Sequence, residues 1–250
     1  MLGNVDYILC EDTRRAQKLK THFALRPKLV SFHEHNEKQR IPKILSLMEQ
    51  GKTFALISDA GTPLISDPGA LLIRALIDRN LPFTCAPGAS AITTALILSG
   101  FPAQPFSFFG FLPTRQTKRH LLLQKIRELT DHTVILYESP QRMVGLLREL
   151  GETIGNRRLA ICRELTKLHE EVIRGTIAEL LSHFSTREIK GEFTVVIAPG
   201  EAQTLTLSDE ALRSRFLQLI NEGLNKREAL RKLAKESGRS RNELYDLLMK

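Results

Sequence analysis

The sequence predicts an α/β protein with two lobes followed by a helical segment. Over residues 1–103, apolar segments typical of strands alternate with segments typical of helices, which favours a mainly parallel sheet flanked by helices. Three expected strands end in loops rich in Gly, Pro, Ser or acidic residues, and open α/β sheets bind their ligands at such strand ends. Leucine-rich periodicity after residue 207 indicates helices without strands.

The first lobe is expected over residues 1–103. Its predicted strands and helices alternate along the chain, and the segment from Gly100 to Pro105 is typical of a hinge. The strands are predicted at 7–10, 28–32, 53–58 and 83–86, and the helices at 18–23, 41–50, 70–79 and 91–99.

The second lobe is expected over residues 104–200. Its last strand is rich in Val and Ile and is expected to lie at the centre of a sheet. Strands are predicted at 106–111, 133–137, 158–163, 170–175 and 192–198, and helices at 117–129, 141–150 and 177–184.

The remaining residues, 201–250, are expected to form a helical tail. A polar connector at 201–207 precedes a helix that Ser208 caps. Two further short helices, at 227–237 and 241–249, resemble a helix-turn-helix. The alternative is a helical bundle that packs on the lobes or on a partner subunit.

The composition is that of an ordinary soluble protein. The chain has 250 residues, a length that is enough for two domains with cores of their own. Of these residues, 42% are hydrophobic and 26% are charged. No apolar run approaches the ~20 residues that span a bilayer, and no signal peptide is visible, so we expect a cytoplasmic protein without a membrane partner. The three cysteines are scattered beside apolar patterns, which favours buried free thiols.

A formal net charge of +8 favours polyanionic partners. The basic residues gather in three clusters: just before and within the first expected helix, just before and within the helix at 117–129, and in the tail. Each cluster is equally compatible with a solvated helix face. The candidate RNA-binding residues are Arg15, Lys18, Arg115, Lys118, Arg119, Arg239 and Arg241.

The most informative loop runs from Ser58 to Gly69, between an expected strand and an expected helix. Its glycines permit unusual backbone angles, its prolines fix φ, and it carries the carboxylates of Asp59 and Asp67. The alternative is a tight connection in which Asp67 caps the following helix. A second loop, at 86–91, consists of small residues, and a third follows Tyr137. None is a Walker A or G-x-G-x-x-G motif, so neither a nucleoside triphosphate nor a dinucleotide is expected.

Two histidines, His33 and His35, raise the possibility of a metal site with Glu34 and Glu37. Alternate residues of a strand share a face, so the two imidazoles could converge. No cysteine or third histidine stands at a spacing typical of metal ligands, so a polar or RNA-facing loop is the favoured interpretation and no metal is expected.

Seven segments in order resemble the bacterial 16S ribosomal RNA (cytidine 2'-O)-methyltransferases, of the tetrapyrrole-methylase-like superfamily. The resemblance covers the chain from about Val5 to its end. The segments are CEDTR at 10–14, FHEHNE at 32–37, SDAGTP at 58–63, APGASA at 86–91, YESP at 137–140, RELTKLHEE at 163–171 and GEFTVVI at 191–197.

The resemblance implies a two-lobed architecture with S-adenosylmethionine in a cleft between the lobes. It also implies a small ribosomal subunit substrate, with the target cytidine in the decoding region of its RNA, and a homodimer. The residues that match the donor pocket are Asp59, Ala60, Gly61, Ser66, Asp67, Ala89, Ser90, Ala91, Tyr137, Leu165 and Thr194.

Methyl transfer from a sulfonium to a ribose hydroxyl needs near-attack geometry and a group that assists loss of the hydroxyl proton. Candidates for the base are Asp12, Asp59, Glu138 and Glu164, with Arg14, Arg163 or Lys167 as electrostatic helpers. Asp12 and Arg14 are equally compatible with a structural ion pair at a strand end. From this set, the predicted catalytic residues are Asp12, Arg14, Glu138 and Glu164.

In the family, a strand, a Gly-containing loop and a helix precede the region that matches Val5 and Asp6. Here the sequence begins with MLGN, so we expect weaker donor binding in a chain that starts at Met1. Two other functions stay open. One is C-methylation of a tetrapyrrole on the same architecture, and the other is a non-catalytic RNA-binding or assembly module.

Overall fold

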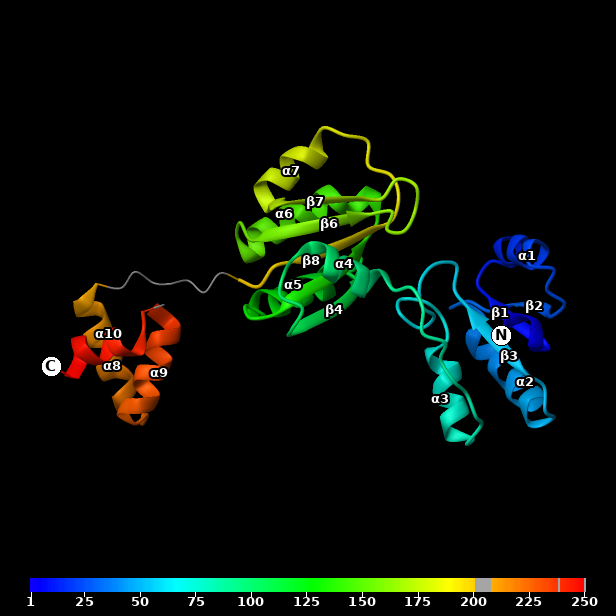
Figure 1. The fold of residues 1–250 in the computed structure, drawn as a ribbon, viewed down its shortest axis with the longest axis horizontal. Helices are drawn as coiled ribbons and strands as arrows, with labels where there is room; N and C mark the ends of the chain where they lie inside the picture. Colours follow the sequence, from blue (N-terminus) through cyan, green and yellow to red (C-terminus); the bar gives the residue numbers. More distant parts are fainter. Residues whose placement is uncertain (201–207, 238, 250) are drawn as a thin grey trace. The chain divides into compact units, whose positions relative to one another are not determined.

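The computed structural model describes residues 1–200, 208–237 and 239–249 (Figure 1). The chain divides into two compact units, Met1–Ala95 and Leu96–Lys250. The division falls within helix α4 (Ala91–Ser99), a helix that the sequence predicted. The polar connector expected at 201–207 lies outside the described residues. Among those described, no helix is long and apolar enough to cross a membrane.

A three-stranded parallel sheet forms the centre of the first unit, in the order β2-β1-β3. This confirms the parallel sheet that the alternating pattern predicted. Its elements, after the short 3-10 helix η1 (Leu2–Asn4), are β1 (Tyr7–Cys10), α1 (Thr13–His22), β2 (Lys28–Ser31), α2 (Glu37–Glu49), β3 (Phe54–Ile57) and α3 (Ala70–Asp78).

Two of these helices begin earlier than the sequence predicted. Helix α1 begins at Thr13 because the Asp12 side chain accepts a hydrogen bond from the Arg14 backbone N–H and so caps it. Helix α2 begins at Glu37 and continues through Pro42. Helices α2 and α3 pack on the sheet through a core of Leu9, Phe32, Ile44, Leu45, Leu72 and Leu76.

The strand predicted at 83–86 is absent, and this prediction was wrong. In the described chain, residues 81–90 belong to no helix or strand. A strand needs a neighbour with which to form a hydrogen-bonded ladder, and none of the described strands pairs with this segment. Cys85 is consequently exposed, whereas Cys10 and Cys162 are buried, so the prediction of buried thiols fails at Cys85.

A five-stranded mixed sheet, in the order β4-β5-β8-β6-β7, forms the centre of the second unit. Strand β8 (Phe193–Ile197) is antiparallel to both of its neighbours, and all five of its residues are buried, which confirms its predicted central position. The other strands are β4 (Phe106–Phe111), β5 (Thr133–Glu138), β6 (Arg158–Arg163) and β7 (Glu171–Thr176).

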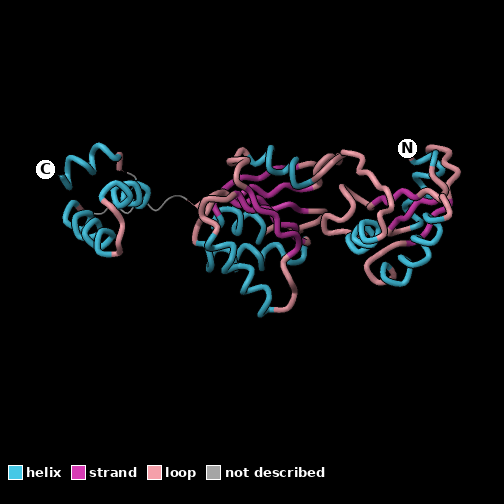
Figure 2. Tube along the Cα trace, turned by 90° about the horizontal axis from the view of Figure 1, so that it is seen from below, coloured by secondary structure: helices cyan, strands magenta, loops and turns pink. Residues whose placement is uncertain are grey.

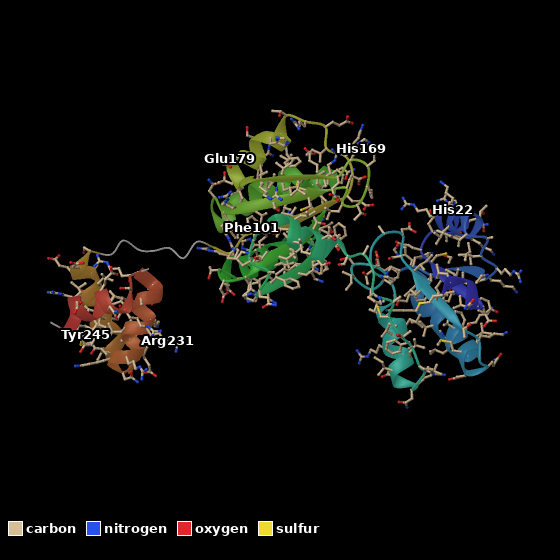
Figure 3. The ribbon with its side chains drawn as sticks, viewed as in Figure 1. His22, Phe101, His169, Glu179, Arg231 and Tyr245 are labelled. Carbon is tan, nitrogen blue, oxygen red and sulfur yellow. The ribbon has the colours of Figure 1, made fainter. Side chains whose placement is uncertain are left out.

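Three helices pack with this sheet around one apolar core (Figure 2). They are α5 (Gln116–Glu128), α6 (Met143–Ile154), which follows the short 3-10 helix η2 (Pro140–Arg142), and α7 (Ile177–Ser185). Thr176 and Glu179 form a capping box at the start of α7, which fixes where this helix begins (Figure 3).

The described part of the tail, residues 208–237 and 239–249, has three helices, α8 (Asp209–Asn221), α9 (Lys226–Ser237) and α10 (Arg241–Met249). As predicted, Ser208 caps α8, since its hydroxyl accepts a hydrogen bond from the Ala211 backbone N–H at 3.3 Å. The helices share a small core of Leu212, Phe216, Leu219, Ala229, Leu230, Leu233 and Leu244. Gly238, in the turn predicted between α9 and α10, lies outside the described residues.

Candidate functional site

The loop between β3 and α3 adopts left-handed backbone angles at four positions. Gly61 has φ 74° and Gly69 φ 129°, while Leu64 and Ser66, which are not glycines, have φ 73° and 66°. Non-glycine residues rarely adopt positive φ, and they keep it only where the surrounding structure imposes it. The predicted donor loop is therefore a rigid, strained turn at the carboxyl end of a parallel strand.

Hydrogen bonds hold this loop together and attach it to the second predicted donor loop. The Ser58 hydroxyl lies 3.3 Å from the Ala60 carbonyl oxygen and 3.2 Å from that of Gly61. The Thr62 hydroxyl donates to the Ala89 carbonyl at 3.0 Å. Because of this last bond, the segments around Gly61 and Ala89 are neighbours, as donor binding by both requires.

Helix α3 is not capped by Asp67, contrary to the alternative that the sequence left open. Its N-cap is Gly69, which has no side chain to offer. The helix begins only after the strained loop has ended, so the Asp67 carboxylate stays in the same loop as Asp59 and Ser66.

Asp12 and Asp59 lie near one another, at the carboxyl ends of β1 and β3. Burial raises the pKa of the Cys10 thiol first, and the negative charges of Asp59 and Asp12 raise it further. Asp59 forms an ion pair with Arg15, whose Nη1 atom is 3.2 Å from Oδ2. This edge of the sheet therefore carries two carboxylates, one of which is paired with an arginine.

The predicted catalytic pair Asp12 and Arg14 has a structural role at the start of α1. Asp12 Oδ1 accepts hydrogen bonds from the Arg14 backbone N–H at 2.8 Å and from Arg14 Nε at 3.3 Å. The backbone bond, followed by the side-chain bond, holds the pKa of Asp12 below its usual value. A carboxylate with a depressed pKa is a weak proton acceptor, which argues against Asp12 as the base.

In the second unit, three of the residues predicted to contact the donor gather at one end of the sheet. Tyr137 on β5 and Thr194 on β8 are direct partners in the antiparallel register. Leu165 follows the end of β6, whose last residue, Arg163, pairs with Phe193. The Tyr137 ring also packs against Phe108, with ring centroids 4.9 Å apart.

Glu138, a predicted catalytic residue, is held in a buried network of charges. Its side chain is fully buried, and its Oε1 atom accepts hydrogen bonds from Arg142 Nε at 2.6 Å and from the Ser139 backbone N–H at 2.9 Å. Arg119 Nη2 lies 3.7 Å from Glu138 Oε2 and 2.6 Å from Glu149 Oε2. This network joins the end of β5 to α5 and α6.

Arg119 therefore does not belong with the exposed basic residues among which the sequence placed it. Its side chain is only 7% exposed and is engaged by two carboxylates. Its neighbours Arg115 and Lys118 are exposed. We accordingly leave Arg119 out of the RNA-binding residues that we propose.

Glu164 joins two of the segments that carry the family resemblance. Its backbone has φ 49°, and its Oε1 atom accepts from Lys167 Nζ at 2.9 Å and from the Glu192 backbone N–H at 2.8 Å. The Lys167 bond, then the Glu192 bond, lowers the pKa of Glu164. Glu164 thus organises the β6–β7 loop, which carries His169 (Figure 3), and its depressed pKa argues against a role as base.

The remaining predicted RNA-binding residues are exposed. Arg15 and Lys18 lie three positions apart on α1, so they are neighbours on its surface. Arg241 is the first residue of α10, and Arg239 lies two positions before it, with Arg239 Nη1 2.7 Å from Asp209 Oδ1 on α8. Arg231 and Tyr245, also exposed, mark α9 and α10 in Figure 3.

His33 and His35 do not assemble a metal site with other residues of the described chain. Their ring centroids are 6.0 Å apart, and the His33 Nε2 atom is 2.9 Å from the Asn36 amide nitrogen. Within residues 1–200, 208–237 and 239–249, no group of three or more His, Cys, Asp or Glu residues could hold a metal ion.

Two polar residues that link parts of the first unit were not predicted. Thr62 connects the two donor loops, and Glu37 binds the start of α3. Both lie inside the segments that carry the resemblance, which was the only signal. A contact with a partner about 30 residues away leaves no periodic pattern in a single sequence.

The profile of one protein family, described as Tetrapyrrole (Corrin/Porphyrin) Methylases, matches residues 1–181. The chain belongs to this family. Within it, the chain is 40% identical over 248 residues to Ribosomal RNA small subunit methyltransferase I of Synechocystis sp., covering 98% of this chain and 88% of that protein. The protein of the same name from Thermotoga maritima is 43% identical over 200 residues, covering 80% of this chain and 89% of its own length.

Solved structures with the tetrapyrrole-methylase fold resemble this chain. The methyltransferase CobJ superposes with a TM-score of 0.59 at 16% identity, covering 79% of this chain and 84% of CobJ. Diphthine synthase gives a TM-score of 0.59 at 15% identity, covering 79% of this chain and 81% of its own. A uroporphyrin-III C-methyl transferase from Thermus thermophilus, solved with S-adenyl homocysteine, gives a TM-score of 0.52 at 12% identity. The match covers 80% of this chain and 87% of that protein. At these identities the likeness concerns the fold alone.

Proposed function

We propose that this chain transfers a methyl group from S-adenosylmethionine to the ribose 2'-hydroxyl of a cytidine in the decoding region of 16S ribosomal RNA. The observation that carries the proposal is the Thr62–Ala89 hydrogen bond, which joins the two small-residue loops at strand ends. The 40% identity to a small-subunit RNA methyltransferase over nearly the whole chain supports the substrate class.

The donor-binding residues that we propose are those that the family resemblance implies. Asp59, Ala60, Gly61, Ser66, Asp67, Ala89, Ser90 and Ala91 supply backbone amides, carbonyls and carboxylates from the first unit. Tyr137, Leu165 and Thr194 supply side chains from one end of the second sheet. The small side chains at 89–91 leave room for a ligand against the backbone, and a tetrapyrrole methylase solved with S-adenyl homocysteine supports this type of donor.

The chemistry needs little beyond positioning, because a sulfonium is a good leaving group and the methyl transfer is an in-line displacement. The four predicted bases differ in their surroundings. Asp12 and Glu164 have depressed pKa values, and Glu138 is buried among arginines. Asp59, opposed by the exposed Arg15, is the candidate that we favour for assisting loss of the hydroxyl proton.

The RNA is held, in this proposal, by the exposed basic residues Arg15, Lys18, Arg115, Lys118, Arg239 and Arg241. The net charge of +8 of the whole chain also favours binding to a polyanion such as RNA. The proposal also includes a homodimer, on the basis of the family resemblance, and a cytoplasmic location, in keeping with the proposed ribosomal substrate. Sedimentation of the purified chain over a range of concentrations tests the dimer.

The decisive experiment incubates the full chain and labelled S-adenosylmethionine with assembled 30S subunits and with naked 16S RNA, and then maps the label. Label on the 2'-oxygen of one cytidine in the decoding region is the expected result. Label on a tetrapyrrole substrate but not on 30S subunits would favour the C-methyltransferase alternative. Binding to 30S subunits without donor binding, measured by calorimetry, would instead identify a non-catalytic module.

A further inference from the structure

Glu37, the first residue of α2, uses its side chain to cap a different helix. It is 6% exposed, and its Oε1 atom accepts hydrogen bonds from the backbone N–H groups of Gly69 at 3.2 Å, Leu71 at 3.1 Å and Leu72 at 3.4 Å. These three N–H groups lie at the start of α3, which follows the proposed donor loop.

This contact takes the place of the cap that the N-cap residue of α3 does not supply. The first N–H groups of a helix have no partner within the helix, and the N-terminus carries a partial positive charge that favours a carboxylate. Gly69, the N-cap of α3, has no side chain that could accept from them. The carboxylate of Glu37 is therefore the acceptor for three N–H groups at the start of α3.

The point that Glu37 binds is the tightly packed exit of the donor loop. Gly69 has φ 129°, and a Cβ atom added there would lie 2.6 Å from Leu56 Cδ2 and 2.9 Å from Leu64 Cδ1. Leu64 and Ser66, just before this exit, have left-handed conformations, which non-glycine residues keep only where the surrounding structure imposes them. Strand β3 holds one end, and the contact of Glu37 with α3 holds the other.

Glu37 is itself fixed in place by the turn that precedes α2. The Asn36 side-chain oxygen accepts from the His33 backbone N–H at 2.9 Å, and its amide nitrogen donates to the Ser31 carbonyl at 3.4 Å. Residues 31–37 thus connect the end of β2 to the start of α3. This part of the FHEHNE segment, interpreted from the sequence as polar or RNA-facing, makes a connection inside the first unit.

From this geometry we propose that Glu37 is a positioning residue for the methyl donor. Glu37 touches no substrate in this proposal. It holds the loop at 58–69 in the conformation that binds S-adenosylmethionine, so the inference rests on the proposed function. Because an acceptor oxygen must reach the same three N–H groups, an amide of the same side-chain length should act nearly as well as the carboxylate.

The test compares Glu37→Leu and Glu37→Gln with a control, Glu49→Gln. Glu49 lies at the opposite end of α2, where its Oε1 atom is 2.8 Å from Arg79 Nη1, and both side chains are about half exposed. We expect Glu37→Leu to raise the donor dissociation constant at least tenfold in calorimetry. Amide hydrogen exchange at Gly69, Leu71 and Leu72 should also become faster. Glu37→Gln should restore binding to within about threefold, and Glu49→Gln should leave both measurements unchanged.

A purely structural role predicts another pattern. Glu37→Leu would then lower the melting temperature but leave the donor dissociation constant unchanged at temperatures where the variant is folded, and that result would overturn the proposal. Unchanged exchange at the three amides would overturn it as well. If Glu37→Leu does not fold, Glu37→Asp replaces it, because a shorter carboxylate should lengthen the same three bonds. A wild-type chain that binds no donor would overturn the proposed function itself, whereas wild-type binding that the variants share would overturn this inference alone.

Discussion

Arg15 and Asp59 form an ion pair in which Arg15 Nη1 lies 3.2 Å from Asp59 Oδ2. The pair joins a residue that we assign to RNA binding on α1 to a residue that we assign to donor binding in the loop after β3. The Arg15 side chain is 65% exposed, so its charge stays accessible to a phosphate while it faces the carboxylate. The two proposed binding functions therefore meet at the carboxyl edge of the first sheet.

Replacing Arg15 with Ala should weaken binding to 30S subunits and leave the fold intact. One lost phosphate contact should reduce the slope of log affinity against log salt by about 0.7 to 0.9. The free energy of unfolding should change by less than about 1 kcal/mol, because exposed ion pairs contribute little. Filter binding at several salt concentrations, with denaturant unfolding, measures both.

Arg79→Ala is the matched control for Arg15. Arg79 is also an exposed, ion-paired arginine of the first unit, but its partner is Glu49 and we assign it no RNA contact. Its salt slope should equal that of the wild type. Equal slopes in all three proteins would remove Arg15 from the RNA-binding surface.

Two glycine substitutions separate backbone strain from donor binding. Gly61 and Gly51 have φ 74° and 84°, and a Cβ atom at either position would contact nothing within 4 Å in the described chain. Valine at either position should therefore cost about 1–2 kcal/mol of stability, through backbone strain alone. Only Gly61→Val should raise the donor dissociation constant, by a factor of ten or more, which is about 1.4 kcal/mol.

Asp59→Ala completes this series, since it removes one carboxylate and leaves the backbone of the loop unstrained. We expect its effect on the donor dissociation constant to be smaller than that of Gly61→Val. Calorimetric titration of the three variants measures it. If Gly51→Val impaired donor binding as much as Gly61→Val, general destabilisation would explain the loss. If neither Gly61→Val nor Asp59→Ala impaired it, the donor would bind elsewhere.

The buried network around Arg119 gives a prediction about stability. Replacing Arg119 with Met should leave Glu138 and Glu149 without their shared guanidinium, and losing one partner of a buried ion pair costs about 3–5 kcal/mol. Arg115→Met, at an exposed position one turn earlier, should change the free energy of unfolding by less than about 0.5 kcal/mol. Urea titration of the two variants compares these energies.

The same two variants should show the opposite order in RNA binding. Arg115→Met should reduce the salt slope for 30S subunits, whereas Arg119→Met, assayed while folded, should not. A reduced salt slope in Arg119→Met would show that Arg119 contacts RNA, contrary to what its burial predicts.

The burial of Arg119 shows what a basic cluster in a sequence does and does not establish. Arg119, Leu123 and Ile126 are the buried residues of α5, and their spacing is that of one helix face. The buried face of α5 therefore extends into the basic cluster. The helical periodicity of the sequence could have placed Arg119 on this buried face, and Lys118 off it. Which carboxylates it meets could not be predicted, since Glu138 and Glu149 come from other elements.

Strand β8 and the segment at 83–86 show why one apolar pattern was interpreted correctly and a similar one was not. The β8 residues are buried on both faces between two partners, so their Val and Ile content describes their environment. Residues 83–86 have a similar local pattern, but none of the described strands pairs with them. Strand formation depends on a neighbour, and the sequence of the segment alone contains no information about that neighbour.

The helical tail gives the last prediction, because its two interpretations predict different measurements. If the tail binds RNA, Arg241→Ala and Arg239→Ala should each reduce the salt slope by about 0.7 to 0.9. Arg239→Ala should weaken 30S binding at least as much, since it also frees the carboxylate of Asp209, now 2.7 Å from Arg239. Donor affinity should not change, because no proposed donor residue lies in the tail.

Arg215→Ala is the control for the tail. Arg215 on α8 bonds to Glu236 on α9, with Nε 2.9 Å from Oε2 and Nη2 3.0 Å from Oε1. Its loss should lower the melting temperature of the tail without changing the salt slope. Deleting residues 208–250 should reproduce the slope change of the arginine variants if the tail contacts RNA. A deletion that only lowers the melting temperature and keeps the wild-type slope would identify the tail as a structural bundle, and Arg239 and Arg241 would then have no role in RNA binding.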